Sequence, residues 1–366
     1  MVAHHLLTGS YTNSSLFLLA FDTVAKTLTL NQTIPAFGLH QFVTTNAARD
    51  VVYATTMSEP PRLFSWAMSA DYKFTHLNTV DITSSSCYFS SDGEYAFSAG
   101  GPSARIHKLD SDGGIGGQVD EMLYVPAEDL PNVNKTRSAV LWGAHGIDVN
   151  VNKKAFVPHL GWDGIFMYDI LANGSSRFLS LNKSPEKHDG PRNVYPSKNG
   201  RYLYVINEHS QYLDVYKIGK TILTHKQRAS AIPPNVRGQY TYRSNAAQLS
   251  RDGKTIFTST RGWNDAEANG WVAAFALTSE GLLKSEDALT YYQAPLTLGS
   301  AGGLRVAFWE DETNNDREGL TDYMYLSDTS LGFMYILGWM PSTKRLSEVA
   351  RYRYSNASPY EAVWLD

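Results

Sequence analysis

Short runs of alternating hydrophobic and polar residues come in pairs along this chain. Each pair consists of a polar turn, a β-rich run, a loop and a second β-rich run. Asp-Gly or Asn-Gly opens several of the pairs, and both dipeptides form tight turns readily. In one copy Tyr202, Tyr204 and Ile206 alternate with the residues between them, which is the period of a β-strand. The copies begin at His4, Arg49, Asp92, Asn152, Asn199, Asp252 and Thr321.

This repeat predicts the fold class. Seven copies recur at a period of about 45 to 65 residues, and no amphipathic helix of about ten residues or more interrupts them. Repeated β units without helices are typical of propellers, whose four-stranded blades need roughly 45 residues each. The sequence therefore predicts an all-β protein, a seven-bladed β-propeller formed by a single domain over residues 1–366. One or two large β-sandwiches are the alternative.

A propeller must close, and the two ends of the chain suggest how. Residues 4–12 and 360–366 are both strand-like, and we expect them to share one blade, so that N- and C-terminal strands pair. Two longer stretches, residues 119–143 and 279–321, look like insertions, and the second contains an acidic, Asn-rich turn at 310–318. Insertions between repeats usually form loops on one face.

Composition narrows the classes of function. Of the 366 residues 43% are hydrophobic and 19% charged, so the chain can bury a core. The net charge of −4 gives no reason to bind nucleic acid or an anionic membrane. The lone cysteine, Cys87, excludes an internal disulfide and a cysteine-based zinc site, and we interpret it as a small buried hydrophobic residue.

Other sequence signals are absent. No run approaches the roughly 18 apolar residues of a membrane span, and the first residues lack the basic head and apolar stretch of a signal peptide. We therefore expect a cytoplasmic protein without nucleic-acid or membrane partners, while homo-oligomerisation stays open. No phosphate-binding loop, dinucleotide fingerprint or His-Glu-x-x-His motif occurs, so no metal and no cofactor is expected.

Four polar residues in consecutive repeats form the candidate site. His145, Arg192, Glu208 and Arg261 each lie where an apolar or glycine-bounded segment gives way to a loop. The guanidinium forks of two arginines suit a polycarboxylate or a phosphate, and a histidine and a glutamate can transfer a proton. Taken singly, such an Arg or Glu is more often a surface charge, so the set carries more weight than its members.

Four neighbours extend the candidate list. His188 either lines the pocket or is an ordinary loop residue, and Trp263, two residues after Arg261, is expected to touch the substrate. Arg243 and Arg305 each offer a further cation at the start of a predicted strand.

One segment carries a family resemblance. HDGPRNVYPSKNGRYLYVINEHSQYLDVYKI, residues 188–218, resembles the signature of the seven-bladed lactonase-type propeller family, which includes 6-phosphogluconolactonases and fungal 3-carboxy-cis,cis-muconate cyclases. The segments 4–9, 145–146, 259–261 and 362–366 are closer to the cyclase branch, whereas Gly190-Pro191 is closer to the lactonase branch. On the cyclase pattern, His145, Arg192, Glu208 and Arg261 match the proposed active-site positions.

The resemblance implies a cofactor-independent cycloisomerase. It would lactonise 3-carboxy-cis,cis-muconate, a small anionic tricarboxylate of the β-ketoadipate pathway of aromatic-compound catabolism. Arg192 and Arg261 would hold the carboxylates together with His188 and Trp263, and His145 or Glu208 would deliver the proton. Neighbouring arginines lower the pKa of a glutamate, which favours His145 as the donor. A 6-phosphogluconolactonase-type hydrolase of sugar lactones is the alternative, and a non-catalytic interaction propeller is the third option.

Overall fold

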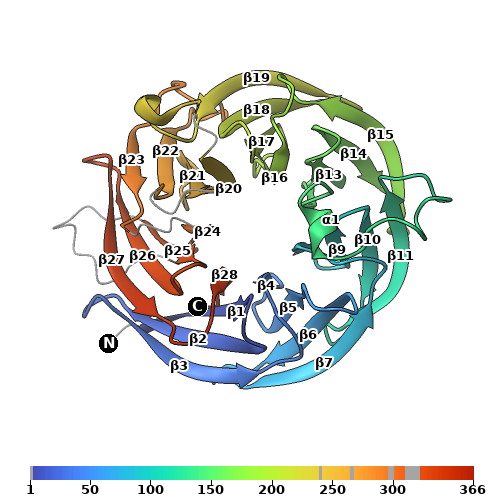
Figure 1. Cartoon of the computed structure of the whole chain (residues 1–366), viewed down its shortest axis with the longest axis horizontal. Helices are drawn as coiled ribbons and strands as arrows, with labels where there is room; N and C mark the ends of the chain where they lie inside the picture. Colours follow the sequence, from blue (N-terminus) through green and yellow to red (C-terminus); the bar gives the residue numbers. More distant parts are fainter. Residues whose placement is uncertain (1–2, 239–240, 264–267, 296–300, 310–321) are drawn as a thin grey trace. The chain divides into compact units, whose positions relative to one another are not determined.

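The secondary structure of the protein is almost entirely β. The computed structural model describes residues 3–238, 241–263, 268–295, 301–309 and 322–366. Within these ranges 28 strands form seven four-stranded sheets, whose strands are labelled in Figure 1. The helical elements of the same residues are α1 (Arg137–Val140) and the single 3-10 turn Pro234–Val236. The predicted all-β class and the seven four-stranded blades of the propeller are confirmed.

Each sheet is built from strands that follow one another along the chain, except that the last strand joins the first sheet. The sheets, each in its order of pairing, are β28 (Pro359–Trp364), β1 (Ala3–Ser10), β2 (Ser15–Asp22) and β3 (Thr27–Pro35); β4 (Val43–Thr45), β5 (Val51–Thr55), β6 (Arg62–Met68) and β7 (Phe74–Asp81); β8 (Tyr88–Ser91), β9 (Tyr95–Gly100), β10 (Ser103–Leu109) and β11 (Ile115–Leu123); β12 (Asp148–Val149), β13 (Lys154–His159), β14 (Gly164–Ile170) and β15 (Ser176–Lys183); β16 (Pro191–Pro196), β17 (Tyr202–Asn207), β18 (Tyr212–Ile218) and β19 (Leu223–Ser230); β20 (Tyr242–Leu249), β21 (Thr255–Gly262), β22 (Trp271–Ala276) and β23 (Thr290–Gln293); and β24 (Ala301–Val306), β25 (Asp322–Asp328), β26 (Phe333–Met340) and β27 (Arg345–Arg353).

The repeats found in the sequence are the two central strands of each sheet. In the fourth sheet, for example, the repeat that begins at Asn152 contains β13 and β14. Most residues of these strands are buried, because a central strand is covered on both faces. The edge strands give weaker patterns: β12 has two residues, and β15 is mostly exposed or half-buried. The stretch 279–321 also contains strands, β23 and β24, whereas its acidic turn at 310–318 lies outside the described residues.

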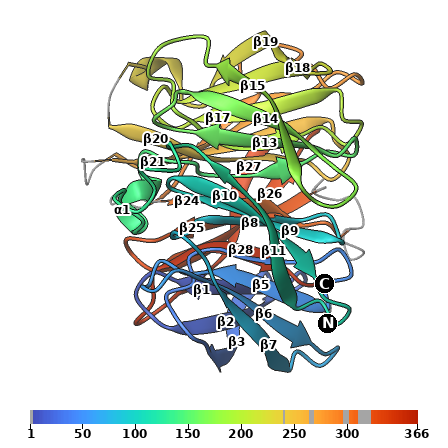
Figure 2. The ribbon, with the colours of Figure 1, turned by 90° about the vertical axis from the view of Figure 1, so that its right-hand side faces the viewer.

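The closing of the first sheet follows the prediction. β28 pairs with β1 in antiparallel register, with Leu6 opposite Trp364 and Thr8 opposite Ala362. In Figure 1 β28, β1, β2 and β3 follow one another in this order, and in Figure 2 the marks of the two chain ends lie close together. Beyond the strands, the backbone N–H of Leu365 donates to the carbonyl of His5 at 2.9 Å. Hydrogen bonds and buried side chains thus hold the two ends in one sheet.

The described chain forms two compact units. One comprises residues 1–37, 206–215 and 226–366, and the other comprises 38–205 and 216–225. Each has its own apolar core: Phe21, Tyr325 and Trp364 belong to a cluster of the first, and Phe97 and Val157 to a cluster of the second. The single domain over residues 1–366 stays a prediction.

Candidate functional site

A buried ion pair lies at the centre of the candidate site in the first unit. Arg261 Nη2 is 3.3 Å from Glu208 Oε1, and the two side chains are 17% and 8% exposed. Glu208 directly follows β17, and Arg261 is near the end of β21. The backbone N–H of Ser244 in β20 donates to the carbonyl of Glu208 at 3.1 Å, which fixes the glutamate beside the sheet that carries Arg261. The structure therefore brings together two of the predicted residues.

A second arginine joins this pair. Arg243 in β20 lies directly opposite Arg261 in the antiparallel register of β20 and β21. Burial lowers the pKa of Arg243, the carboxylate of Glu208 raises it, and the positive charge of Arg261 lowers it. Arg243 is thus close enough to both groups for their charges to act on it, as a third charged member of the cluster.

Trp263 covers both guanidinium groups. Its ring centre is 5.3 Å from the guanidinium carbon of Arg261 and 5.9 Å from that of Arg243. Stacking of this kind holds planar guanidinium groups in place while their edges stay available to a ligand. The contact of Trp263 with a substrate stays a prediction.

The charges of the cluster do not cancel. Glu208 supplies one negative charge against the positive charges of Arg243 and Arg261, which leaves one net positive charge in a mostly buried place. Arg261 Nε is buried and has no hydrogen-bond partner among the described residues. A buried N–H donor that lacks a partner is costly, and an anion can satisfy both the donor and the charge. We refer to Glu208, Arg243, Arg261 and Trp263 as the arginine cluster.

In the second unit, Arg192 is buried in β16 and is 3% exposed. Its Nη1 donates to Asn193 Oδ1 at 3.4 Å. The loop before it is held by Asp163, whose carboxylate accepts the backbone N–H of His188 at 2.7 Å and that of Gly190 at 2.9 Å. His188 itself is exposed and has a positive φ of 66°. The loop therefore presents the His188 ring to solvent, and Asp163 positions the start of β16.

His145 lies beside the strand of Arg192. A Cβ atom on Gly146 would lie 3.4 Å from the carbonyl oxygen of Arg192, so this segment packs directly on β16. The backbone N–H of His145 donates to Pro158, and its Nδ1 is 3.5 Å from the sulfur of Cys87. Cys87 is 8% exposed, so its predicted burial is confirmed. The structure thus brings His145 close to β16 and adds a thiol neighbour.

The predicted set therefore appears as two groups, one in each unit. Glu208, Arg261 and Trp263 form one, and His145 lies beside the strand of Arg192 in the other. That all of them serve one substrate stays a prediction. The positive charge of Arg305 in β24 acts on Tyr325. It lowers the pKa of that hydroxyl, which burial and the carboxylate of Glu361 raise.

Three contacts were not foreseen from the sequence. The approach of Arg243 to Glu208, the thiol beside His145 and the role of Asp163 all join residues of different strands or loops. The first also depends on a bulge, because the register of β20 and β21 shifts by one residue between Ser244 and Ala246 and so places Arg243 opposite Arg261.

Neither a metal-binding cluster nor a membrane-spanning helix is found in the part of the chain that the structure describes. Among the described ranges, no group of three or more His, Cys, Asp or Glu side chains is arranged to hold a metal ion. None of the helices described is long and apolar enough to cross a membrane.

Some of the known proteins similar to this chain have the names of enzymes. The chain is 27% identical to "Muconate cycloisomerase 1" of Cutaneotrichosporon cutaneum over 99% of its length and 98% of that protein. It is 26% identical to a 6-phosphogluconolactonase of Pectobacterium atrosepticum, over 43% of this chain and 44% of that protein.

Solved structures share the fold over the whole chain. The periplasmic gluconolactonase of Pseudomonas aeruginosa superposes with a TM-score of 0.79 at 18% identity, covering 100% of this chain and 99% of that one. A protein from Lactobacillus plantarum gives a TM-score of 0.77 at 19% identity, with full coverage of both chains. At the level of sequence, the family described as "Lactonase, 7-bladed beta-propeller" matches residues 5–300. The repeat, the seven sheets and this match together show that the chain belongs to the lactonase family of seven-bladed β-propellers.

Proposed function

We propose that this protein is a cycloisomerase that lactonises 3-carboxy-cis,cis-muconate without a cofactor. The observation that carries the proposal is the arginine cluster, in which two guanidinium groups share the single carboxylate of Glu208. A substrate with three carboxylates offers the negative charge that this cluster lacks. The similarity to a muconate cycloisomerase over nearly the whole chain supports the same substrate class.

The chemistry needs cations and one proton. A carboxylate oxygen of the substrate adds to a conjugated carbon–carbon double bond, and the electron pair moves to the carbon beside another carboxylate. The resulting enolate-like charge is then neutralised by a proton, so the reaction consumes one proton and forms one C–O bond. In this proposal Arg261 and Arg243 stabilise the enolate, and such preorganised charge contributes about 3 to 4 kcal/mol per donor.

The proton donor is proposed to be His145. Glu208 lies against Arg261, and a carboxylate beside a cation stays ionised more readily, which makes it a poor acid. The Nδ1 atom of His145 lies 3.5 Å from the sulfur of Cys87, and the neighbouring Gly146 packs against the strand of Arg192. Arg192 remains a proposed carboxylate-binding residue, and a reaction on a small metabolite fits the predicted cytoplasmic location.

The test is a spectrophotometric assay with purified protein. Loss of the diene absorbance of 3-carboxy-cis,cis-muconate is followed, and hydrolysis of 6-phosphogluconolactone is measured in parallel. We expect rapid loss of the diene, and a decrease in kcat of about 100-fold or more in Arg261→Met. Arg177→Met, which removes an exposed arginine from β15, is the matched control and should behave like the wild type.

A second candidate function is hydrolysis of a sugar lactone. The Gly190-Pro191-Arg192 sequence and the similarity to a 6-phosphogluconolactonase favour it. Consumption of the phosphogluconolactone without diene loss would assign the protein to this reaction. Absence of both activities, with folded protein, would refute both assignments and favour a binding role.

A further inference from the structure

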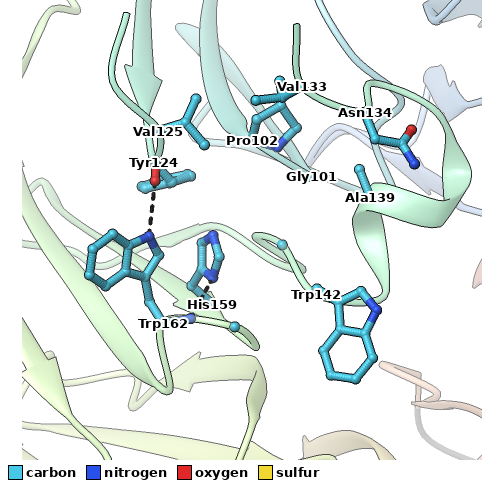
Figure 3. Close-up of a pocket in the computed structure, with 12 residues that line it drawn as sticks. Gly101, Pro102, Tyr124, Val125, Val133, Asn134, Ala139, Trp142, His159 and Trp162 are labelled. Atoms are coloured by element: carbon cyan, nitrogen blue, oxygen red, sulfur yellow. Dashed lines mark hydrogen bonds between the residues drawn. The ribbon is translucent and has the colours of Figure 1, made fainter. Parts of the chain in front are cut away.

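A cavity in the second unit has a chemical character opposite to that of the arginine cluster. Its volume is about 420 Å³, within the range of small-molecule sites. Twelve residues line it, and none of them is Asp, Glu, Lys or Arg. The apolar ones that matter here are Pro102, Val125 and Ala139, together with the rings of Trp142 and Trp162 (Figure 3).

The floor of the cavity is formed by backbone in close approach. A Cβ atom on Gly143 would lie 2.4 Å from the backbone of Gly101, and one on Gly161 would lie 2.4 Å from the carbonyl oxygen of Trp142. The N–H of Gly161 donates to that same carbonyl at 2.8 Å. Glycine is therefore required at Gly143 and Gly161. Together with Gly101, these glycines contribute backbone and no side chain to the lining of the cavity, and we call them the glycine floor.

The two tryptophans present large apolar area at the mouth. Trp142 is 67% exposed and Trp162 is 45% exposed. Trp162 is held in position, because its Nε1 donates to the carbonyl of Tyr124 at 2.9 Å and the ammonium of Lys183 lies 5.2 Å from its ring centre. Exposed tryptophan beside a cavity commonly marks an interaction site, since aromatic rings there can stack on a ligand.

One directed polar group enters the cavity. His159 is 94% buried, and its Nδ1 accepts the backbone N–H of Trp162 at 3.1 Å. The neutral ring must then carry its proton on Nε2, which makes Nε2–H a donor. Figure 3 shows this second nitrogen turned away from the Trp162 backbone, into the space between the labelled residues. No described side chain or carbonyl accepts a hydrogen bond from it.

This donor stays neutral. The pKa of His159 is lowered to about 3, mainly by burial, with a smaller contribution from the positive charge of Lys183. The cavity therefore offers a neutral donor and no charged side chain among its lining residues, and an ionised carboxylate would lose its hydration without a counter-charge there.

We propose that this cavity binds a neutral, single-ring aromatic molecule whose carbonyl oxygen accepts a hydrogen bond from Nε2 of His159. The ring stacks between the tryptophans and the glycine floor, and the carbonyl points inward. This ligand class differs from the tricarboxylate proposed for the arginine cluster, and the inference does not depend on that function.

The test uses fluorine NMR with three probes that share a fluorophenyl ring. 4-Fluoroacetophenone has the ring and the acceptor, 4-fluorotoluene lacks the acceptor, and 4-fluorobenzoate is charged. We expect binding of the ketone, with the toluene and the benzoate each at least about fivefold weaker, since one hydrogen bond contributes roughly this factor. Equal binding of ketone and benzoate, or no binding of the ketone at 5 mM, would overturn the proposal.

Two variants locate the binding in the cavity. Ala139→Leu places a larger side chain in the cavity at a half-buried position of α1, and Trp142→Ala removes an exposed ring from the lining. Neither change is expected to prevent folding. Each should weaken the ketone at least tenfold. Phe37→Ala, which removes an exposed aromatic ring from the other unit, is the control and should leave binding unchanged. Wild-type affinity in both cavity variants, with unchanged circular dichroism, would contradict the assignment.

Discussion

Replacing Glu208 with glutamine should tighten the binding of a tricarboxylate. Glutamine keeps the size of the side chain and a carbonyl oxygen for the contact with Arg261 at 3.3 Å, but it removes the negative charge. The net charge of the arginine cluster then rises by one. An anionic ligand no longer competes with an internal carboxylate for the same guanidinium groups.

The size of the effect follows from Coulomb's law. A ligand carboxylate on the fork of Arg261 would lie roughly 5 Å from the Glu208 carboxylate, and two charges at that distance repel by about 3 kcal/mol at an effective dielectric constant near 20. Arg261 is 17% exposed, so water weakens this repulsion. A gain of about 1.5 to 3 kcal/mol, or roughly 10- to 100-fold in Kd, is expected. The free energy of unfolding should fall by about 1 to 3 kcal/mol, because two arginines lose their counter-charge.

The assay is isothermal titration calorimetry with propane-1,2,3-tricarboxylate, which lacks the diene and cannot cyclise. Glu348→Gln is the matched control, because Glu348 pairs with Arg351 through Nε and Nη2 at 2.5 and 2.8 Å on β27. The control should bind like the wild type. Unchanged or weaker binding in a folded Glu208→Gln protein would refute the view that this carboxylate occupies an anion site.

Three further predictions concern folding and positioning. His40 is fully buried, and burial lowers its pKa from 6.5 to about 4. The unfolded chain therefore binds a proton more readily than the folded protein, and stability that is present above pH 6.5 is lost as the pH falls towards 4. In urea unfolding, this residue should make the protein about 2 kcal/mol less stable at pH 5 than at pH 7, and His40→Gln should remove that part of the pH dependence. Asp163→Ala should lower kcat/KM about tenfold by freeing the loop before Arg192 while circular dichroism stays unchanged; a wild-type rate would contradict the positioning role. Trp364→Ala, at a side chain that is 1% exposed, should cost about 3 to 5 kcal/mol in urea unfolding, and a loss below about 1 kcal/mol would show that the closing strand contributes little.

The sequence predicted the fold well where strands are central. The pairs β13–β14 and β17–β18 are long, rich in β-branched and aromatic residues, and bounded by glycine turns. A strand such as β12, with two residues, is formed by its hydrogen bonds to a neighbour and has almost no pattern of its own. The division into seven units was therefore clear, whereas the edge strands were not.

The turn at Asp92-Gly93 depends on the aspartate side chain as well as on the glycine. At Asp92-Gly93 only the glycine has a positive φ, of 90°. The aspartate instead accepts the backbone N–H groups of Glu94 and Tyr95 at 3.0 and 2.8 Å. The side chain thus closes the turn through hydrogen bonds to the following residues.

The candidate site could be predicted only as a set of residue types. Arginine, histidine and glutamate near strand ends are visible in the sequence, but the contacts among them depend on the sheet register and on loops far apart in the chain. Cys87 and His145 are separated by 58 positions, and no local pattern connects them. The charge balance of the arginine cluster likewise needed the position of Arg243 opposite Arg261.

The pairing of β28 with β1 has a consequence for synthesis of the protein. Thr8 and Glu361, which are linked by a hydrogen bond, are 353 positions apart in the chain. At about 5 to 20 residues per second, a ribosome needs on the order of 20 to 70 s to make the second partner after the first. Throughout this interval the edge of β1 that later pairs with β28 exposes unpaired N–H and C=O groups next to apolar side chains. The nascent chain is then most open to wrong pairing with another copy, so slower initiation or a chaperone that covers β1 should raise the yield of folded protein.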